Sequence, residues 1–181
     1  YQRNLKLIKD AGIKWLALGI ESADRNVRLE VSKGKFQDVD IKEVIHQVES
    51  AGIDVMANYI FGLTGDTKET MQSTLDLSLD LATIGWNAYS AVPLPGSQLY
   101  KDAITAGHAL PKDYVDYSFY SYTTKPIPVG TLSSEDILRF RDEAYTIYHT
   151  SPKFLKRVEE KYGKQAVDNI IENTKIKLKR K

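Results

Sequence analysis

The 181-residue sequence predicts an α/β fold in which parallel strands alternate with helices. Three similar segments begin at Asp10, Ser50 and Thr83, and they read "DAGIKWLALGIES", "SAGIDVMANYIFG" and "TIGWNAYSAVPLPG". Each carries an apolar, β-prone run without a clean polar alternation, which is typical of strands covered on both faces. Helical segments separate these runs. The order is that of right-handed βα units, which suit either a barrel wall or an open doubly wound sheet.

The apolar runs are the predicted strands. Their ranges are 15–20, 55–63 and 88–94. A glycine precedes each run and suits the end of a helix, because glycine adopts a left-handed backbone at little cost. These glycines are Gly12, Gly52 and Gly85.

Helices are predicted between the strands. The segment 38–52, "DVDIKEVIHQVESAG", places its aliphatic side chains on one stripe at helical spacing. After the second strand, "LDLSLDLA" alternates with period two and by itself resembles a strand. The length of the segment, and Asp66 three residues before Glu69 as a capping box, favour a helix.

Beyond the third strand the composition changes. Residues 111–132 are rich in tyrosine and contain three prolines, which predicts an irregular segment that covers the first part of the chain. A helix is predicted from Ser133, capped by "SSED", and a helical pair broken near Gly163 from Pro152 onward. We therefore divide the chain into residues 1–110, a covering segment 111–132 and a helical extension 133–181.

Composition excludes several classes of function. The sequence has no cysteine, so it contains no disulfide, no thiolate nucleophile and no cysteine ligand for a metal or cluster. The net charge of +1 gives no general reason for a nucleic-acid partner, and the basic end "KIKLKRK" is interpreted as a solvated helix end. No apolar run is long enough to span a membrane, so we expect a cytoplasmic protein. The chain opens on Tyr1 and resembles an excised piece.

Polar residues follow the predicted strands where parallel strands bind ligands, at their carboxyl ends. Glu21 and Ser22 end the first strand, and "GLTGDT" from Gly62 ends the second. Glu21 and Ser22 could simply cap the next helix, and "GLTGDT" could be a plain turn or could offer free backbone N–H groups to a ligand. Asn58 lies inside a strand and is either a satisfied amide or a ligand contact. Lys33 stands at a helix end, where a solvated lysine is the alternative to a binding role.

Three strings, in order, resemble the second half of the barrel of radical S-adenosylmethionine (radical SAM) enzymes. They are "AGIKWLALGIESADRNVRLEVSKGK", "AGIDVMANYIFGLTGDTKETMQSTLDLSLDL" and "NAYSAVPLPGSQLY", and they cover about residues 1–105. The resemblance implies half of a (βα)6 partial TIM-type barrel, with three parallel strands and their helices, plus the C-terminal helical extension. This chain would supply the fourth, fifth and sixth strands, and the missing N-terminal half of the barrel would be its partner.

The resemblance also implies a set of SAM-binding residues. Glu21, with Ser22 beside it, would contact the polar end of SAM, and Lys33 would lie near the SAM carboxylate. Asn58 would approach the ribose, and the turn from Gly62 would lie beside the ligand. The adenine would face the backbone of Ser90, Ala91 and Val92. The turn departs from the family pattern, with Thr64 in place of proline and Asp66 in place of glutamate.

Enzymes similar to this chain hold a [4Fe-4S] cluster in a CxxxCxxC loop and cleave SAM to a 5′-deoxyadenosyl radical. Because this chain has no cysteine, the cluster ligands are expected upstream, no catalytic or metal-binding residue is assigned, and the fragment alone is expected to be inactive. Residues 106–160 resemble the cobalamin-associated branch, related to anaerobic Mg-protoporphyrin monomethyl ester cyclase, which implies a possible cobalamin.

The resemblance predicts a fragment of a radical SAM oxidoreductase or transferase whose substrate the sequence does not name. One alternative is a half-barrel that serves as a binding or scaffold module without a cofactor. Another is part of an RNA-modifying enzyme, which the lack of aromatic residues among the basic ones of the tail disfavours. The strand edges left by a missing half would favour self-association.

Overall fold

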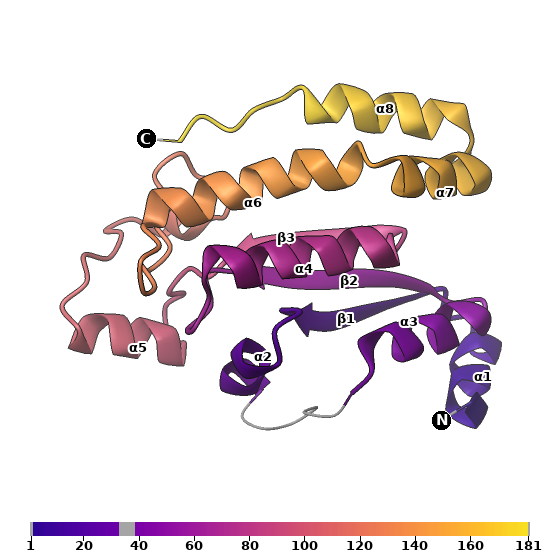
Figure 1. The fold of residues 1–181 in the computed structure, drawn as a ribbon, viewed down its shortest axis with the longest axis horizontal. Coiled ribbons are helices and arrows are strands. Elements are labelled where there is room, and N and C mark those ends of the chain that lie inside the picture. The colour runs from indigo at the N-terminus through magenta and orange to yellow at the C-terminus, as the bar shows by residue number, and fades with distance from the viewer. Residues whose placement is uncertain (1, 33–38, 181) are drawn as a thin grey trace.

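The computed structural model describes residues 2–32 and 39–180. Figure 1 shows the arrangement of its elements. None of the helices in these ranges is long and apolar enough to cross a membrane. In chain order the elements are α1 (Gln2–Asp10), β1 (Trp15–Glu21), α2 (Arg25–Ser32), α3 (Ile41–Ser50), β2 (Asp54–Phe61), α4 (Lys68–Leu81), β3 (Gly85–Ser90), α5 (Gln98–Thr105), the 3-10 helix η1 (Tyr114–Tyr117), α6 (Ser134–His149), α7 (Pro152–Tyr162) and α8 (Lys164–Thr174).

The three strands form one parallel sheet in the order β1-β2-β3. This confirms the predicted α/β class, with three parallel strands, their helices and a C-terminal helical extension, an arrangement consistent with a half-barrel. One face of the sheet packs on the helices and forms the main core, in which Val55, Tyr59 and Phe61 of β2 are almost fully buried. In Figure 1, α6 and α7 lie between the sheet and α8.

The opposite face of the sheet, here called the open face, is only partly covered. Register pairs place its side chains in rows across the strands, because paired residues of parallel strands point to the same side. The open face comprises Ala17, Gly19, Met56, Asn58, Ile60, Asn87 and Tyr89. The prediction that both faces are covered is therefore wrong for this chain, and β2 instead alternates between buried and half-buried residues.

The third strand lies earlier in the sequence than predicted. It spans Gly85–Ser90 rather than 88–94, and Gly85 is a strand residue rather than a helix end. A Cβ on Gly85 would lie 2.9 Å from the Met56 Cα, so the close approach of β2 explains this glycine. The left-handed position that ends α4 is Ala82, with φ of 47°. Gly12 and Gly52 do have positive φ, as predicted.

The helix caps were predicted in part. Ser133 and Asp136 form the predicted capping box of α6, and Gly163 separates α7 from α8. The Asp66–Glu69 box is wrong, because Thr67 caps α4 and pairs with Thr70. The C-terminal basic segment is not a solvated helix end, since α8 ends at Thr174 and the residues after it lie against α6.

Candidate functional site

The carboxyl ends of the three strands lie along one edge of the sheet, here called the rim. Glu21 of β1 pairs with Tyr59 of β2, and Phe61 of β2 pairs with Ser90 of β3. Because all the strands are parallel, the residues that follow them emerge on the same side, as the sequence predicted. The rim therefore brings together segments that are about 70 residues apart in the chain, from Glu21 to Ser90.

Glu21 stands in an unusual position at the rim. A bulge between Gly19 and Glu21 shifts the register, and Glu21 has φ of 63°, a left-handed value that is strained for a glutamate. A Cβ on Gly19 would lie 2.4 Å from the Glu21 Oε1, so the carboxylate lies over the open face. Within the described ranges no group donates a hydrogen bond to this half-buried carboxylate, and burial raises its pKa.

Substituting Glu21 with Gln is expected to remove a pH dependence of stability. The raised pKa means that the folded protein binds more protons than the unfolded chain. The free energy of unfolding of the wild type therefore falls as the pH rises from the usual value of 4.5 through the folded pKa. Relative to the wild type, Glu21→Gln should gain stability between pH 4 and pH 7, measured by urea unfolding.

A matched substitution at an exposed glutamate, Glu30→Gln, should leave that slope unchanged. Glu21→Gly also removes the left-handed strain and should stabilise the fold by about 1 kcal/mol at neutral pH. Equal slopes for the wild type and Glu21→Gln would contradict the inferred burial of this charge.

Two amides lie side by side on the open face. Asn58 of β2 donates to the Leu18 carbonyl at 3.3 Å and to the Met56 carbonyl at 3.2 Å. The Asn87 amide of β3 donates to the Asn58 Oδ1 at 3.0 Å. Asn58 is thus a satisfied amide of the sheet, yet the second N–H of Asn87 and the free lone pairs of both amides remain available on this face.

Ser22 is fully buried and takes part in the connection to α2. Its Oγ lies 3.2 Å from the Thr74 Oγ1 and accepts a hydrogen bond from the Asp24 N–H. The cap of α2 is Asp24, whose carboxylate accepts from the N–H groups of Asn26 and Val27. A contact between SAM and the Ser22 side chain stays a prediction, and the observed partners of Ser22 are structural.

The turn after β2 is organised by Asp66, which is 4% exposed. Its Oδ2 accepts hydrogen bonds from the N–H groups of Gly62 and Leu63 at 3.0 and 2.9 Å, and its Oδ1 accepts from the Thr70 hydroxyl. Burial raises the pKa of Asp66, and these donors partly offset the rise. The N–H groups of Gly62 and Leu63 are therefore occupied, which favours the plain-turn alternative at these two positions.

Ser90, Ala91 and Val92 leave β3 with buried side chains, and Ala91 donates its N–H to the Phe61 carbonyl. Beyond them the covering segment 111–132 reaches the open face, where the Phe119 and Tyr89 rings lie 4.8 Å apart. A cavity of about 690 Å³ lies outside the rim, between the turn at Gly62, helix α5 and the covering segment. This volume lies within the range of small-molecule sites.

Some predictions fall outside this geometry. Lys33 lies outside the described residues. Among the described residues, no group of three or more His, Asp and Glu side chains is placed to hold a metal ion. Sequence reasoning missed Asn87, because the third strand was predicted to begin at residue 88. Tyr89 lay within the predicted strand but was given no role. The alternation of "NAYS" after Gly85 is the signal that could have found them.

These features define a class of protein, an α/β half-barrel with an acid, an amide pair and an aromatic wall at the carboxyl ends of its strands. No family model matches the chain. It is 25% identical over 160 residues to an uncharacterized methyltransferase of Pyrococcus horikoshii. The aligned residues make up 87% of this chain and 34% of that protein. It is also 30% identical over 139 residues to the anaerobic magnesium-protoporphyrin IX monomethyl ester cyclase of Cereibacter sphaeroides. Here the aligned residues make up 74% of this chain and 21% of that enzyme.

Both relatives carry the names of enzymes, and the chain spans only about a third and a fifth of their lengths. The cyclase match agrees with the branch that the covering segment and helical extension resemble. An enzyme is therefore the kind of protein to which this half-barrel is similar.

Proposed function

We propose that this chain is the second half of a radical SAM barrel and that its open face binds one side of SAM. The observation that carries the proposal is the Glu21 carboxylate, which is half-buried, strained and without a donor among the described residues. A bound ammonium group would supply the missing donor through charge-assisted hydrogen bonds. Strain and an unpaired charge at one rim position are typical of a ligand site.

The other residues of the open face fit the remainder of a nucleoside-like ligand. Gly19 has no side chain, so the Glu21 carboxylate can lie over the β1 backbone on the open face. The Asn58–Asn87 pair offers both a donor and acceptors to ribose hydroxyl groups. The backbone after Ser90 would face the adenine. In this arrangement the chain would bind and orient SAM, and the rim cavity outside it would receive the substrate.

The residues of this chain do not fit a [4Fe-4S] cluster, because the sequence has no cysteine to hold one. We therefore derive no chemical step through a cluster here. The cluster ligands of the complete enzyme would lie in a part of the protein other than this sequence, and the same holds for any domain that binds cobalamin.

The bare edge of β1 supports a missing barrel half as the partner. Trp15 is 42% exposed, and Ala17 and Gly19 are exposed as well. A cavity of about 440 Å³ runs beside this edge and is lined largely by aliphatic side chains, Ile41 and Val44 among them. By contrast, β3 is packed against α6, whose Arg141 donates to the Ala88 carbonyl. An added parallel strand would pair with β1 and bury this surface.

Titration of SAM into the protein, followed by NMR of the backbone amides, tests the proposal. We expect weak binding by the 181-residue chain, with Kd on the order of 1 mM, because only one side of the ligand is contacted. Shifts should concentrate at Gly19, Glu21, Asn58 and Asn87. Glu21→Gln should reduce the affinity about tenfold, since a charge-assisted hydrogen bond is lost. The exposed Asp76→Asn should not.

An absence of shifts on the open face up to 10 mM SAM would contradict the proposal and favour a scaffold role. Tight binding, with Kd below about 10 µM, would instead contradict the inference that essential SAM ligands lie outside this chain.

A further inference from the structure

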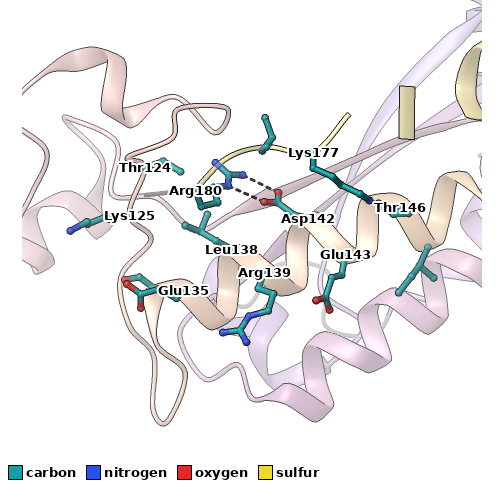
Figure 2. Close-up of a pocket in the computed structure, with 13 residues that line it drawn as sticks. Thr124, Lys125, Glu135, Leu138, Arg139, Asp142, Glu143, Thr146, Lys177 and Arg180 are labelled. Atoms are coloured by element: carbon teal, nitrogen blue, oxygen red, sulfur yellow. Dashed lines mark hydrogen bonds and ion pairs between the residues drawn. The ribbon is translucent and has the colours of Figure 1, made fainter. Parts of the chain in front are cut away.

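The C-terminal tail, residues 175–180, runs back along α6 to the covering segment. Lys177 Nζ donates to the Thr146 Oγ1 of α6 at 2.9 Å. At the end of the tail, Arg180 reaches Asp142 of α6, and only 17% of its side chain is exposed. The tail, α6 and the covering segment together line a cavity of about 680 Å³ (Figure 2). The tail therefore joins elements that are remote in sequence.

Arg180 uses its guanidinium to hold two elements at once. Its Nε and Nη2 donate to the two carboxylate oxygens of Asp142 at 2.8 and 2.9 Å, the paired contact drawn in Figure 2. Its Nη1 donates to the main-chain carbonyls of Phe119 and Ser121 at 3.1 and 2.8 Å. Bidentate pairing fixes the orientation of the guanidinium, and that orientation aims the remaining N–H groups at the covering segment.

A second arginine connects the same carboxylate to the sheet. Arg141 Nη1 lies 3.1 Å from the Asp142 Oδ1, and Arg141 Nε donates to the Ala88 carbonyl of β3 at 2.8 Å. The Arg141 guanidinium also lies 5.8 Å from the centre of the Tyr120 ring. Asp142 is thus shared by two arginines, one anchored on β3 and the other on the covering segment. Both arginines also donate to main-chain carbonyls, and these further hydrogen bonds offset part of the cost of burying the charges.

One of the two residues that Arg180 holds, Phe119, contacts the open face. Phe119 accepts from Arg180 through its carbonyl and places its ring 4.8 Å from the ring of Tyr89. Ser121, the other acceptor, also donates to Asp116 and so keeps the loop closed on itself. The same covering segment continues to residues 127–130, which line the rim cavity. A substitution in the tail would therefore alter the packing of Phe119 on Tyr89 at the open face.

We infer that Arg180 is a positioning residue: paired with Asp142, it holds the covering segment against the sheet so that Phe119 packs on Tyr89 and closes one side of the open face. The inference rests on these contacts and does not require that the ligand be SAM.

Hydrogen exchange followed by mass spectrometry, combined with a ¹⁹F label, tests this role. Arg180→Ala should speed exchange of residues 114–124 by about tenfold or more, because hydrogen bonds to a charged group are lost. Exchange in α4 and α7 should not change. With 3-fluorotyrosine placed at position 89, the resonance in Arg180→Ala should move to the value seen in Phe119→Ala, since both lose the ring contact.

Three further variants make the test specific. Arg180→Lys keeps the charge but cannot make the four contacts together, so it should not restore the wild-type exchange or resonance. Lys179→Ala removes an exposed neighbour and should behave as the wild type. Asp142→Asn leaves the tail sequence intact and should reproduce the local effect of Arg180→Ala. Unchanged exchange and resonance in Arg180→Ala, or full restoration by lysine, would overturn the inference.

Discussion

Substituting Gly62 with Ala is expected to destabilise the protein by about 3 kcal/mol. Gly62 has φ of 80°, and a Cβ there would lie 2.7 Å from both the Cδ1 and the Cγ2 of Ile137. Ile137 is fully buried between α6 and the sheet, so it has little room to move. The left-handed backbone and the collision with Ile137 each cost a comparable amount of stability, and the two costs add. Urea unfolding, by circular dichroism, measures the sum.

The two penalties can be separated. Gly130 also has positive φ, 55°, but a Cβ there would meet nothing within 4 Å. Gly130→Ala should therefore show the backbone penalty alone, about 1 kcal/mol. In an Ile137→Ala background Gly62→Ala should lose most of its collision term, which gives a coupling of about 1–2 kcal/mol in a double-mutant cycle. Strict additivity would show that the collision with Ile137 does not limit this turn.

Substituting Asp66 with Ala is expected to destabilise the protein by about 3 kcal/mol. The substitution removes the acceptor for two backbone N–H groups, those of Gly62 and Leu63, and for the Thr70 hydroxyl, all at a buried site. Unmet buried donors are costly because water cannot replace the lost partner. The amide resonances of Gly62 and Leu63 should lose their protection from hydrogen exchange, and global stability should fall in parallel.

The control for Asp66 is its amide counterpart. Asp66→Asn keeps one acceptor for the two N–H groups and can donate to Thr70, so its loss should be about 1 kcal/mol. The exposed Asp76 of α4, which accepts from Gln72, should tolerate alanine within about 0.5 kcal/mol. Equal losses for the alanine and asparagine variants at position 66 would contradict an acceptor role for this carboxylate.

The positions of the first two strands and most helices could be predicted because local patterns carry them. The apolar runs that lead to Glu21 and Phe61 are longer than the apolar runs found in turns, so they indicate strands. The "SSED" capping box involves only residues that are close in sequence, so it too can be recognised from the sequence. The third strand was placed too late, since Gly85 was interpreted as a helix end. A glycine required by close packing on Met56 looks the same in sequence as one required by a turn.

The residues of the candidate site that could be predicted are those given by one rule, that ligands bind at the carboxyl ends of parallel strands. That rule indicated Glu21 and the residues after β2 and β3, and the three strand ends do share one rim. The rule could not show which groups are already satisfied. The Ser22 hydroxyl already has a hydrogen-bond partner in Thr74, and the Gly62 N–H already donates to Asp66. The Asn58 Oδ1 likewise accepts a hydrogen bond from Asn87. Thr74 and Asn87 come from elements that meet only after folding, whereas Asp66 belongs to the same turn as Gly62.

By itself the sequence determined the succession of βα units, their parallel sense and the gathering of polar residues at one edge, because periodicity and strand-end chemistry are local properties. Tertiary structure alone decided that one face of the sheet stays open and that the carboxylate of Glu21 turns back over Gly19. It also decided that Arg180 of the basic tail donates hydrogen bonds to Asp142 and to the covering segment. The open face and the tail contacts depend on which surfaces meet, and contacts between residues 38 or more positions apart leave no periodic trace in a single chain. The position of Glu21 depends on a bulge and a left-handed backbone that its residue type does not predict.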